Sequence, residues 1–98
     1  MKYTITEVQI IPIKPQNGLL AIASFVFDNS LFCGSVGIYT RINGGYRLTY
    51  PTRKTFLKSS NVFYPINKDV ASEIEKVVIA KFEEVMKAYD RHNSPYLE

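Results

Sequence analysis

Turn-forming segments recur along the first half of this 98-residue chain: Gln16-Asn17-Gly18, Asp28-Asn29-Ser30 and Asn43-Gly44-Gly45. Their residue types reach the positive φ angles that tight hairpin turns require. The stretches between them are rich in β-branched and aromatic residues, which favour strands. Strands joined by such short turns pair antiparallel, so this half of the chain is predicted to form a meander.

The strands between these turns are predicted to occupy different places in one sheet. Residues 19–28 are apolar on both faces, which is typical of a central strand. Pro12 cannot donate a hydrogen bond to a neighbouring strand, so we expect a bulge or a sheet edge at that position. The expected strands span residues 4–14, 19–28, 31–42, 46–50 and 62–64.

The last third of the chain has the pattern of a long amphipathic helix. Asn67 is predicted to cap its start, with Asp69 in the first turn, where a negative charge meets the positive end of the helix dipole. Apolar residues then recur at helical spacing. They are Val70, Ile74, Val77, Val78, Phe82, Val85 and Tyr89. The fold class predicted is therefore α+β, an antiparallel meander of about five strands with one long C-terminal helix of about six turns.

One domain is expected over residues 1–90, followed by a flexible tail over 91–98. A single helix covers only one face of the sheet, although residues 19–27 are apolar on both. A chain of this length also leaves much apolar surface poorly covered. We therefore expect a homodimer in which two sheets join at an edge or stack on their apolar faces.

Acidic residues are missing from the middle of the chain. Between Asp28 and Asp69 the sequence contains six basic residues and no acidic one. The basic residues are Arg41, Arg47, Arg53, Lys54, Lys58 and Lys68. Residues 69–98 carry a net negative charge instead. Such segregation is typical of a protein that presents a cationic surface to a polyanion.

A basic loop with aromatic flanks, Tyr50–Lys58, lies in the middle of this cationic segment. Its adjacent Arg53 and Lys54 suit phosphate, because arginine binds it with a planar fork and lysine with a point charge. Strand alternation places Arg47 opposite its neighbouring tyrosines, where it extends the cationic surface, and Lys68 adds charge beside a helix N-terminus.

Aromatic residues interleave with these charges, which is the composition expected where nucleic-acid bases stack on rings. They are Tyr39, Tyr46, Phe56, Phe63 and Tyr64. The alternative, that the rings form core and the cations protect a sheet edge, stays open at this point.

Catalytic groups are scarce. The single Cys33 lies in an apolar strand and the single His92 in the expected tail, so we expect a buried thiol and a surface imidazole instead of a nucleophilic pair. Glycine-rich phosphate motifs and metal-binding cysteine pairs are missing. We expect a cytoplasmic protein that is not an enzyme, with no cofactor, metal, membrane association or small-molecule substrate.

Three segments resemble the SpoVG family of bacterial stage V sporulation and septation regulators. They are Ala21-Ile22-Ala23-Ser24, Pro51-Thr52-Arg53-Lys54-Thr55 and Tyr64-Pro65-Ile66-Asn67. The likeness extends from about Ile5 to Tyr89. It implies a small dimeric domain with an antiparallel sheet and a C-terminal helix, which binds DNA and RNA and influences septation, sporulation or gene expression.

The resemblance also implies which residues contact nucleic acid. Arg53 and Lys54 match the family's basic pair, in reversed order. Asn67, Lys68 and Asp69 occupy the positions of its helix start, where Lys68 and Asp69 replace the family's small hydroxyl residues. The carboxylate of Asp69 would repel a phosphate at that helix end.

The sequence thus predicts a nucleic-acid-binding regulator that acts as a homodimer. The predicted contact residues are Arg53, Lys54, Arg47, Lys58, Arg41, Lys68 and Asn67. The alternative is a non-enzymatic protein-interaction module that docks a partner on a sheet edge or on the apolar sheet face.

Overall fold

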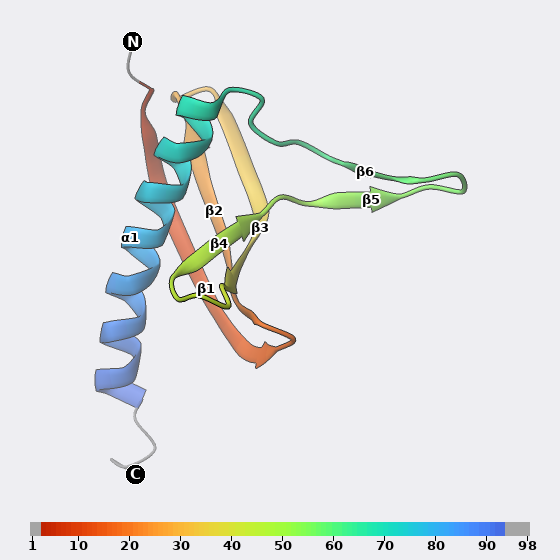
Figure 1. The fold of residues 1–98 in the computed structure, drawn as a ribbon. Coiled ribbons are helices and arrows are strands. Elements are labelled where there is room, and N and C mark those ends of the chain that lie inside the picture. Colours follow the sequence, from red (N-terminus) through yellow and green to blue (C-terminus); the bar gives the residue numbers. More distant parts are fainter. Residues whose placement is uncertain (1–2, 94–98) are drawn as a thin grey trace.

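The computed structural model describes residues 3–93 and contains a curved antiparallel sheet with one long helix against one of its faces (Figure 1). The main sheet has four strands in the order β1-β2-β3-β4, and a separate two-stranded sheet pairs β5 with β6. The elements are β1 (Ile5–Gln16), β2 (Leu19–Phe27), β3 (Leu31–Thr40), β4 (Tyr46–Thr49), β5 (Thr52–Lys54), β6 (Ser59–Asn61) and α1 (Lys68–Asn93). The predicted α+β class, with an antiparallel sheet and a C-terminal helix, is confirmed.

The three predicted turns join consecutive strands of the main sheet. Asn17 and Gly18 connect β1 to β2 with φ angles of 53° and 88°. Asp28 and Asn29 follow β2 with φ angles of 52° and 53°, and the Asn43-Gly44-Gly45 segment lies between β3 and β4. These positive φ angles explain why Asn, Asp and Gly occupy the turns.

β1 is an edge strand, as Pro12 indicated, because it pairs only with β2 in the sheet order. Its register against β2 shifts between Thr6 and Gln9 and again between Pro12 and Gln16. β2 lies between β1 and β3, which confirms its predicted central place.

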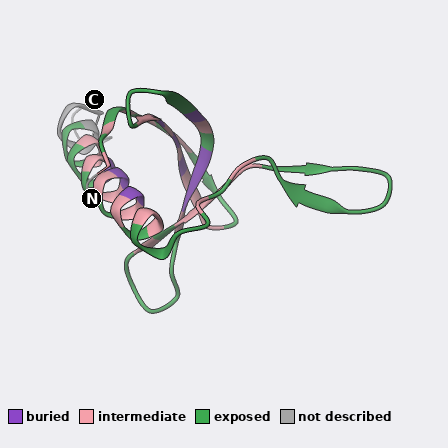
Figure 2. Ribbon diagram, turned by 90° about the horizontal axis from the view of Figure 1, so that it is seen from above, coloured by how far each residue is buried: buried purple, intermediate pink, exposed green. Residues whose placement is uncertain are grey.

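The core lies between the sheet and α1, on one face of the sheet only (Figure 2). The sheet contributes Ala21, Ala23, Phe25, Cys33, Val36 and Ile38, and the helix contributes Ile74, Val78 and Phe82. The ring of Tyr46 packs edge-on against Phe82, with 4.9 Å between ring centroids. The predicted apolar stripe of the helix therefore faces the sheet, although the side chain of Tyr89 lies outside the described residues.

Asn67 caps α1 as predicted. Its side-chain Oδ1 accepts hydrogen bonds from the backbone N–H groups of Asp69 and Val70, at 2.8 and 3.2 Å. These bonds satisfy N–H groups that have no partner within the helix itself. The cap fixes where the chain turns from the sheet region into α1.

The region between β4 and α1 differs from the sequence-based expectation. The basic loop is a β-hairpin, in which Thr52 pairs with Asn61, Arg53 with Ser60 and Lys54 with Ser59. The predicted strand over residues 62–64 is wrong, because the strand lies over Ser59–Asn61 instead. Ser59, Ser60 and Asn61 contain no apolar residue, so hydrophobic alternation gave no signal for β6.

α1 continues to Asn93, past the predicted domain end at residue 90. Residues 94–98 of the predicted flexible tail lie outside the described residues. Within residues 3–93, the structure contains no helix with the length and apolar character needed to cross a membrane.

Candidate nucleic-acid interface

The β5–β6 hairpin, residues 52–61, forms an arm that extends away from the rest of the molecule. Figures 1 and 2 show it on the far side of the sheet from α1. All six residues of its two strands are exposed. At the tip, the Thr55 Oγ1 hydroxyl donates to the backbone oxygen of Lys58 at 2.8 Å and accepts from the Lys58 N–H at 3.2 Å. These residues therefore extend the hairpin into solvent and are not buried against the body of the molecule.

Three of the predicted contact residues, Arg53, Lys54 and Lys58, belong to this arm, and all three are exposed. Arg53 and Lys54 are consecutive strand residues, so their side chains point to opposite faces of the hairpin. Each faces a small serine across the hairpin, which leaves both cations open to solvent. Neither of the ion pairs formed among the described residues involves the arm. The arm is consequently a two-sided cationic ribbon.

The root of the arm is anchored to the sheet. The backbone N–H of Val62 donates to the oxygen of Pro51 at 2.8 Å, and the rings of Tyr50 and Phe63 pack edge-on, with centroids 5.8 Å apart. These contacts join the two chain segments where they leave the body of the molecule. They fix the origin of the arm, whereas its tip is held only by the hairpin's own bonds.

Arg47 lies on β4, outside the arm, on the sheet face away from the helix. Its guanidinium carbon lies 4.8 Å from the centroid of the Tyr39 ring, and the residue is exposed. Its neighbours Tyr46 and Leu48 pack on the core instead. The predicted alternation along this strand is confirmed, and it leaves Arg47 on the same side of the sheet as the arm.

Arg41 is the predicted contact residue that the structure separates from the others. Its Nη2 pairs with the Glu75 carboxylate of α1 at 3.3 Å, and its Nε donates to the backbone oxygen of Tyr46 at 3.0 Å. The Arg41 charge is thus partnered by a carboxylate of the helix. The sequence grouped Arg41 with the cationic surface because its carboxylate partner lies 34 residues away in the chain.

Lys68 and Asn67 lie at the start of α1. Lys68 is exposed, but the side-chain oxygen of Asn67 is occupied by the cap, and the exposed Asp69 carboxylate lies in the first turn. The Asp69 charge already compensates the positive end of the helix dipole. The free cation at this helix end is therefore Lys68, next to a carboxylate and a side-chain oxygen that is already in use.

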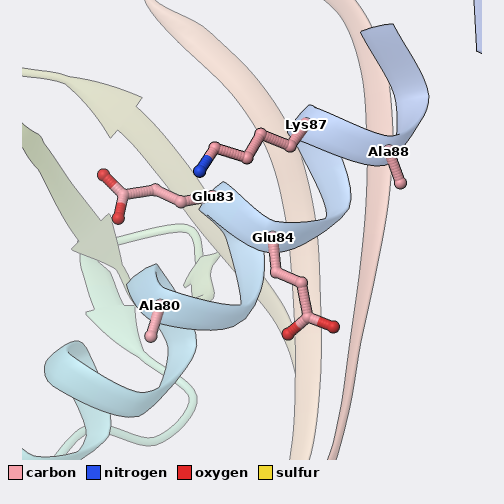
Figure 3. Close-up of a pocket in the computed structure, with 5 residues that line it drawn as sticks. All are labelled: Ala80, Glu83, Glu84, Lys87 and Ala88. Carbon is pink, nitrogen blue, oxygen red and sulfur yellow. The ribbon is translucent and has the colours of Figure 1, made fainter. Parts of the chain in front are cut away.

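The solvent face of α1 carries charges of both signs. A shallow hollow on it is lined by Ala80, Glu83, Glu84, Lys87 and Ala88, and Figure 3 shows two carboxylates and one ammonium group at its rim. Lys81 is itself paired with Glu84 at 3.6 Å. The two carboxylates and the two lysines balance here, so this face has no excess of positive charge to attract a polyanion.

An apolar groove lies between the root of the arm and the start of α1. Its volume is about 330 Å³, and its lining includes Phe27, Leu31, Phe63 and Ile66. Cys33 lies at its base, where burial raises the pKa of the thiol, so the predicted buried cysteine is confirmed. An un-ionised thiol is a poor nucleophile.

Tyr50 also lines this groove. Burial, and then the charges of Glu75 and Cys33, raise the pKa of its phenol to about 12. The raised pKa means that the neutral phenol is favoured over the phenolate in this groove more strongly than in water.

The aromatic residues predicted to interleave with the cations lie in different parts of the structure. Tyr46 and Phe63 pack within the body and at the arm root, Tyr39 lies under Arg47, and Phe56 is fully exposed at the arm tip. Tyr64 is also exposed, at the rim of the groove.

Sequence reasoning missed Phe32. This ring is 71% exposed on β3, on the sheet face opposite the core. The available signal was Gly34, two residues further on the same strand face, which leaves room for the ring.

Comparison with known proteins identifies the family. The SpoVG family model matches residues 3–84. A protein of Caldicellulosiruptor saccharolyticus named "Putative septation protein SpoVG" is 32% identical over 85 residues, which cover 86% of this chain and 96% of the relative. A protein of the same name from Caldicellulosiruptor bescii matches with the same identity and coverage. The chain therefore belongs to the SpoVG family.

Proposed function

We propose that this SpoVG-family protein is a cytoplasmic regulator of septation, sporulation or gene expression that binds DNA or RNA without catalysing a reaction. The observation that carries the proposal is the arm, which offers Arg53, Lys54 and Lys58 to solvent away from any ion pair formed by the described residues. The septation part of the proposal rests on family membership and on the names of the two relatives.

The physical basis of the proposal is the release of counterions from a polyanion. A protein that neutralises phosphates with lysine and arginine releases the cations condensed on them, so its affinity falls as salt concentration rises. Contacts of this kind fix position on the nucleic acid without reading sequence. With Arg53 and Lys54 on opposite faces, the arm can contact phosphates on both of its sides. We therefore expect strong salt dependence and modest base preference.

The test is a binding titration of the full-length protein against labelled DNA and RNA oligonucleotides at several salt concentrations. The Arg53→Ala/Lys54→Ala variant should bind more weakly, and the slope of log K against log salt should fall by about 2 for a duplex, at roughly 0.9 per phosphate contact. The matched control is Lys76→Ala/Lys87→Ala, which removes the same charge from exposed positions on α1. Equal effects of the two variants would show that net charge alone matters and would remove the arm from the site.

The proposal includes a homodimer built through the arm and the apolar groove. Exposed apolar side chains concentrate there, with Phe56 and Leu57 at the tip and Tyr64 and Ile66 beside the groove. An isolated two-stranded hairpin is only marginally stable in water, so a second copy packed against it would stabilise it. A dimer would also double the number of cationic arms that one nucleic acid meets.

Sedimentation equilibrium tests the dimer. Wild-type protein should sediment as a dimer, and Phe56→Asp/Leu57→Asp should shift it to the monomer, because burying two carboxylates in an apolar groove is costly. The control Ile42→Asp changes an equally exposed apolar residue in the β3–β4 turn and should leave the dimer intact. A dimer that survives the tip substitutions would exclude the groove as the interface.

A second candidate is a protein-interaction module, favoured by the apolar face that the sheet presents away from α1. Such binding would persist at high salt and would not require Arg53 or Lys54. Nucleic-acid affinity that is lost on adding salt would favour the first proposal.

A further inference from the structure

The outer face of the sheet, the face turned away from α1, has no role in the arm-based proposal. On β3 and β4 it consists of Phe32, Gly34, Gly37, Tyr39, Arg47 and Thr49, since their strand neighbours Val36, Ile38 and Leu48 pack on the core. Within residues 3–93, no element covers this face in either view (Figures 1 and 2). It therefore needs an explanation of its own.

Two glycines make room for aromatic rings on this face. A Cβ atom on Gly34 would lie 2.9 Å from Cε2 of Phe32, and one on Gly37 would lie 3.1 Å from Cε1 of Tyr39 and 2.7 Å from Oγ1 of Thr49. The positive-φ glycines of the chain are at other positions, so these two are not needed for an unusual backbone conformation. Glycine within a strand weakens it, and a close approach is the usual reason for its presence. The Phe32 ring thus leans forward along β3 over Gly34, and the Tyr39 ring leans back over Gly37.

Phe32 and Tyr39 differ in exposure and in their neighbours, although both lie on β3. Phe32 is 71% exposed and has no described aromatic or cationic partner. Tyr39 is half-buried and lies under the exposed guanidinium of Arg47, at 4.8 Å from its centroid. Phe32 and Tyr39 are seven positions apart along β3, about 23 Å between their Cα atoms at the usual rise per residue. A distance of that size accommodates several nucleotides of an extended strand.

The charges on this face suit a polyanionic partner. β2, β3 and β4 contain no acidic residue, and Arg47 contributes a cation. The arm, with Arg53 and Lys54, projects on the same side of the sheet (Figure 2). An exposed ring, an arginine stacked on a second ring and flanking cations form a combination that can bind unpaired bases by stacking while holding the backbone electrostatically.

We propose that the outer face is a stacking platform for single-stranded nucleic acid, with bases on Phe32 and on the Tyr39–Arg47 pair and the backbone held by the arm. This inference rests on the proposed nucleic-acid binding and adds a substrate class to it. Bases in a duplex are stacked on one another and offer no free face, so the platform acts only on single strands.

The chain contains no tryptophan, which permits a direct test. In Phe32→Trp the single indole reports on the platform, and saturation with a 12-nucleotide single strand should quench its fluorescence, whereas a duplex of equal length should not. In Phe32→Ala the affinity for the single strand should fall between about 5-fold and 100-fold, as base–ring stacking predicts, with duplex affinity unchanged. Phe32→Trp should keep wild-type affinity. The control Ile42→Ala truncates an exposed apolar side chain elsewhere and should change neither affinity.

The outcomes separate this inference from the proposal beneath it. If Arg53→Ala/Lys54→Ala weakens binding but Phe32→Ala does not, the platform is overturned and the arm remains. If the wild-type protein binds neither DNA nor RNA, both are overturned. If Phe32→Ala instead dissociates the dimer in sedimentation experiments without a separate effect on single-strand affinity per protomer, the outer face is covered by a second copy and the platform is overturned.

Discussion

In the body of the molecule, formed by β1–β4 and α1, nine apolar side chains are buried, whereas all six strand residues of the arm are exposed. The body is held by side-chain packing between a sheet and a helix. The arm is held by backbone pairing, by the Thr55–Lys58 bonds at its tip and by the contacts at its root.

This difference separates the residues that determine stability from those that carry the proposed function. Burial of apolar area is the main stabilising contribution to a fold, and the arm supplies none of it. Cations at solvent-exposed positions contribute little to stability but are well placed to meet a polyanion. Substitutions in the two regions should accordingly have separable effects.

The largest expected effect contrasts Phe25 in the body with Phe56 in the arm. Phe25 is fully buried, so Phe25→Ala should lower the free energy of unfolding by about 3–5 kcal/mol through lost burial and a residual cavity. Phe56→Ala removes the same side chain from a fully exposed site and should change it by no more than about 0.5 kcal/mol in the monomer. Urea denaturation at low protein concentration measures both. Equal losses would mean that the arm is part of the folded core.

A smaller effect is expected at the cap of α1. Asn67→Ala removes the acceptor for two backbone N–H groups and should cost about 1 kcal/mol, whereas Asn67→Ser should retain most of the stability. Asn61→Ala on the arm is the matched control and should be nearly neutral. Urea denaturation again provides the measurement. If the serine variant loses as much as the alanine variant, the cap is not what Asn67 contributes.

The raised pKa of Tyr50 should make stability depend on pH. Burial, then the charges of Glu75 and Cys33, raise its pKa to about 12, against about 10 in an unfolded chain. Between these values the folded state binds more protons than the unfolded state. Stability from this group is therefore complete below about pH 10 and is lost as the pH rises towards 12.

This loss can be isolated by comparing wild-type protein with Tyr50→Phe in urea denaturation at roughly pH 8 and pH 11. The wild type should lose more stability over that interval than the variant. Tyr64→Phe, at an exposed position, controls for the other tyrosines and should behave as the wild type does. Identical losses in wild type and Tyr50→Phe would contradict the raised pKa.

The smallest effect on global stability is expected from Thr55→Ala at the arm tip. Its hydroxyl closes the turn with Lys58, so its removal should loosen the arm while changing the unfolding free energy by no more than about 0.5 kcal/mol. Limited trypsin digestion should detect the change as faster cleavage after Arg53, Lys54 and Lys58. Unchanged cleavage would show that the turn does not depend on this hydroxyl.

The same contrast explains what could be predicted from the sequence. The body was predictable because its signals are local: positive-φ residues mark the turns, and Ile74, Val78 and Phe82 repeat at helical spacing. The arm was predicted only as a basic loop, since its strands bury nothing and leave no hydrophobic period. Val62 and Phe63 were assigned to a strand because they are apolar, yet Phe63 packs on Tyr50 at the root.

The candidate site was predictable in residue type but not in arrangement. Arg53, Lys54 and Lys58 were identified from local charge and lie together on the arm. Arg41 was grouped with them because its ion pair with Glu75 depends on how the sheet packs against the helix, which local charge does not reveal. Phe32 was missed for the same reason, since an apolar residue in a strand is expected to be buried unless the uncovered face is known.

The anchored root gives the arm an independence that the rest of the chain lacks. Because the Val62–Pro51 hydrogen bond and the Tyr50–Phe63 contact end the body at that point, everything beyond them can change in length or charge without disturbing the interior. Substitutions within residues 52–61 can therefore change the charge and shape of the arm while the scaffold stays the same. The hairpin is a natural grafting point for engineering a new specificity onto this domain.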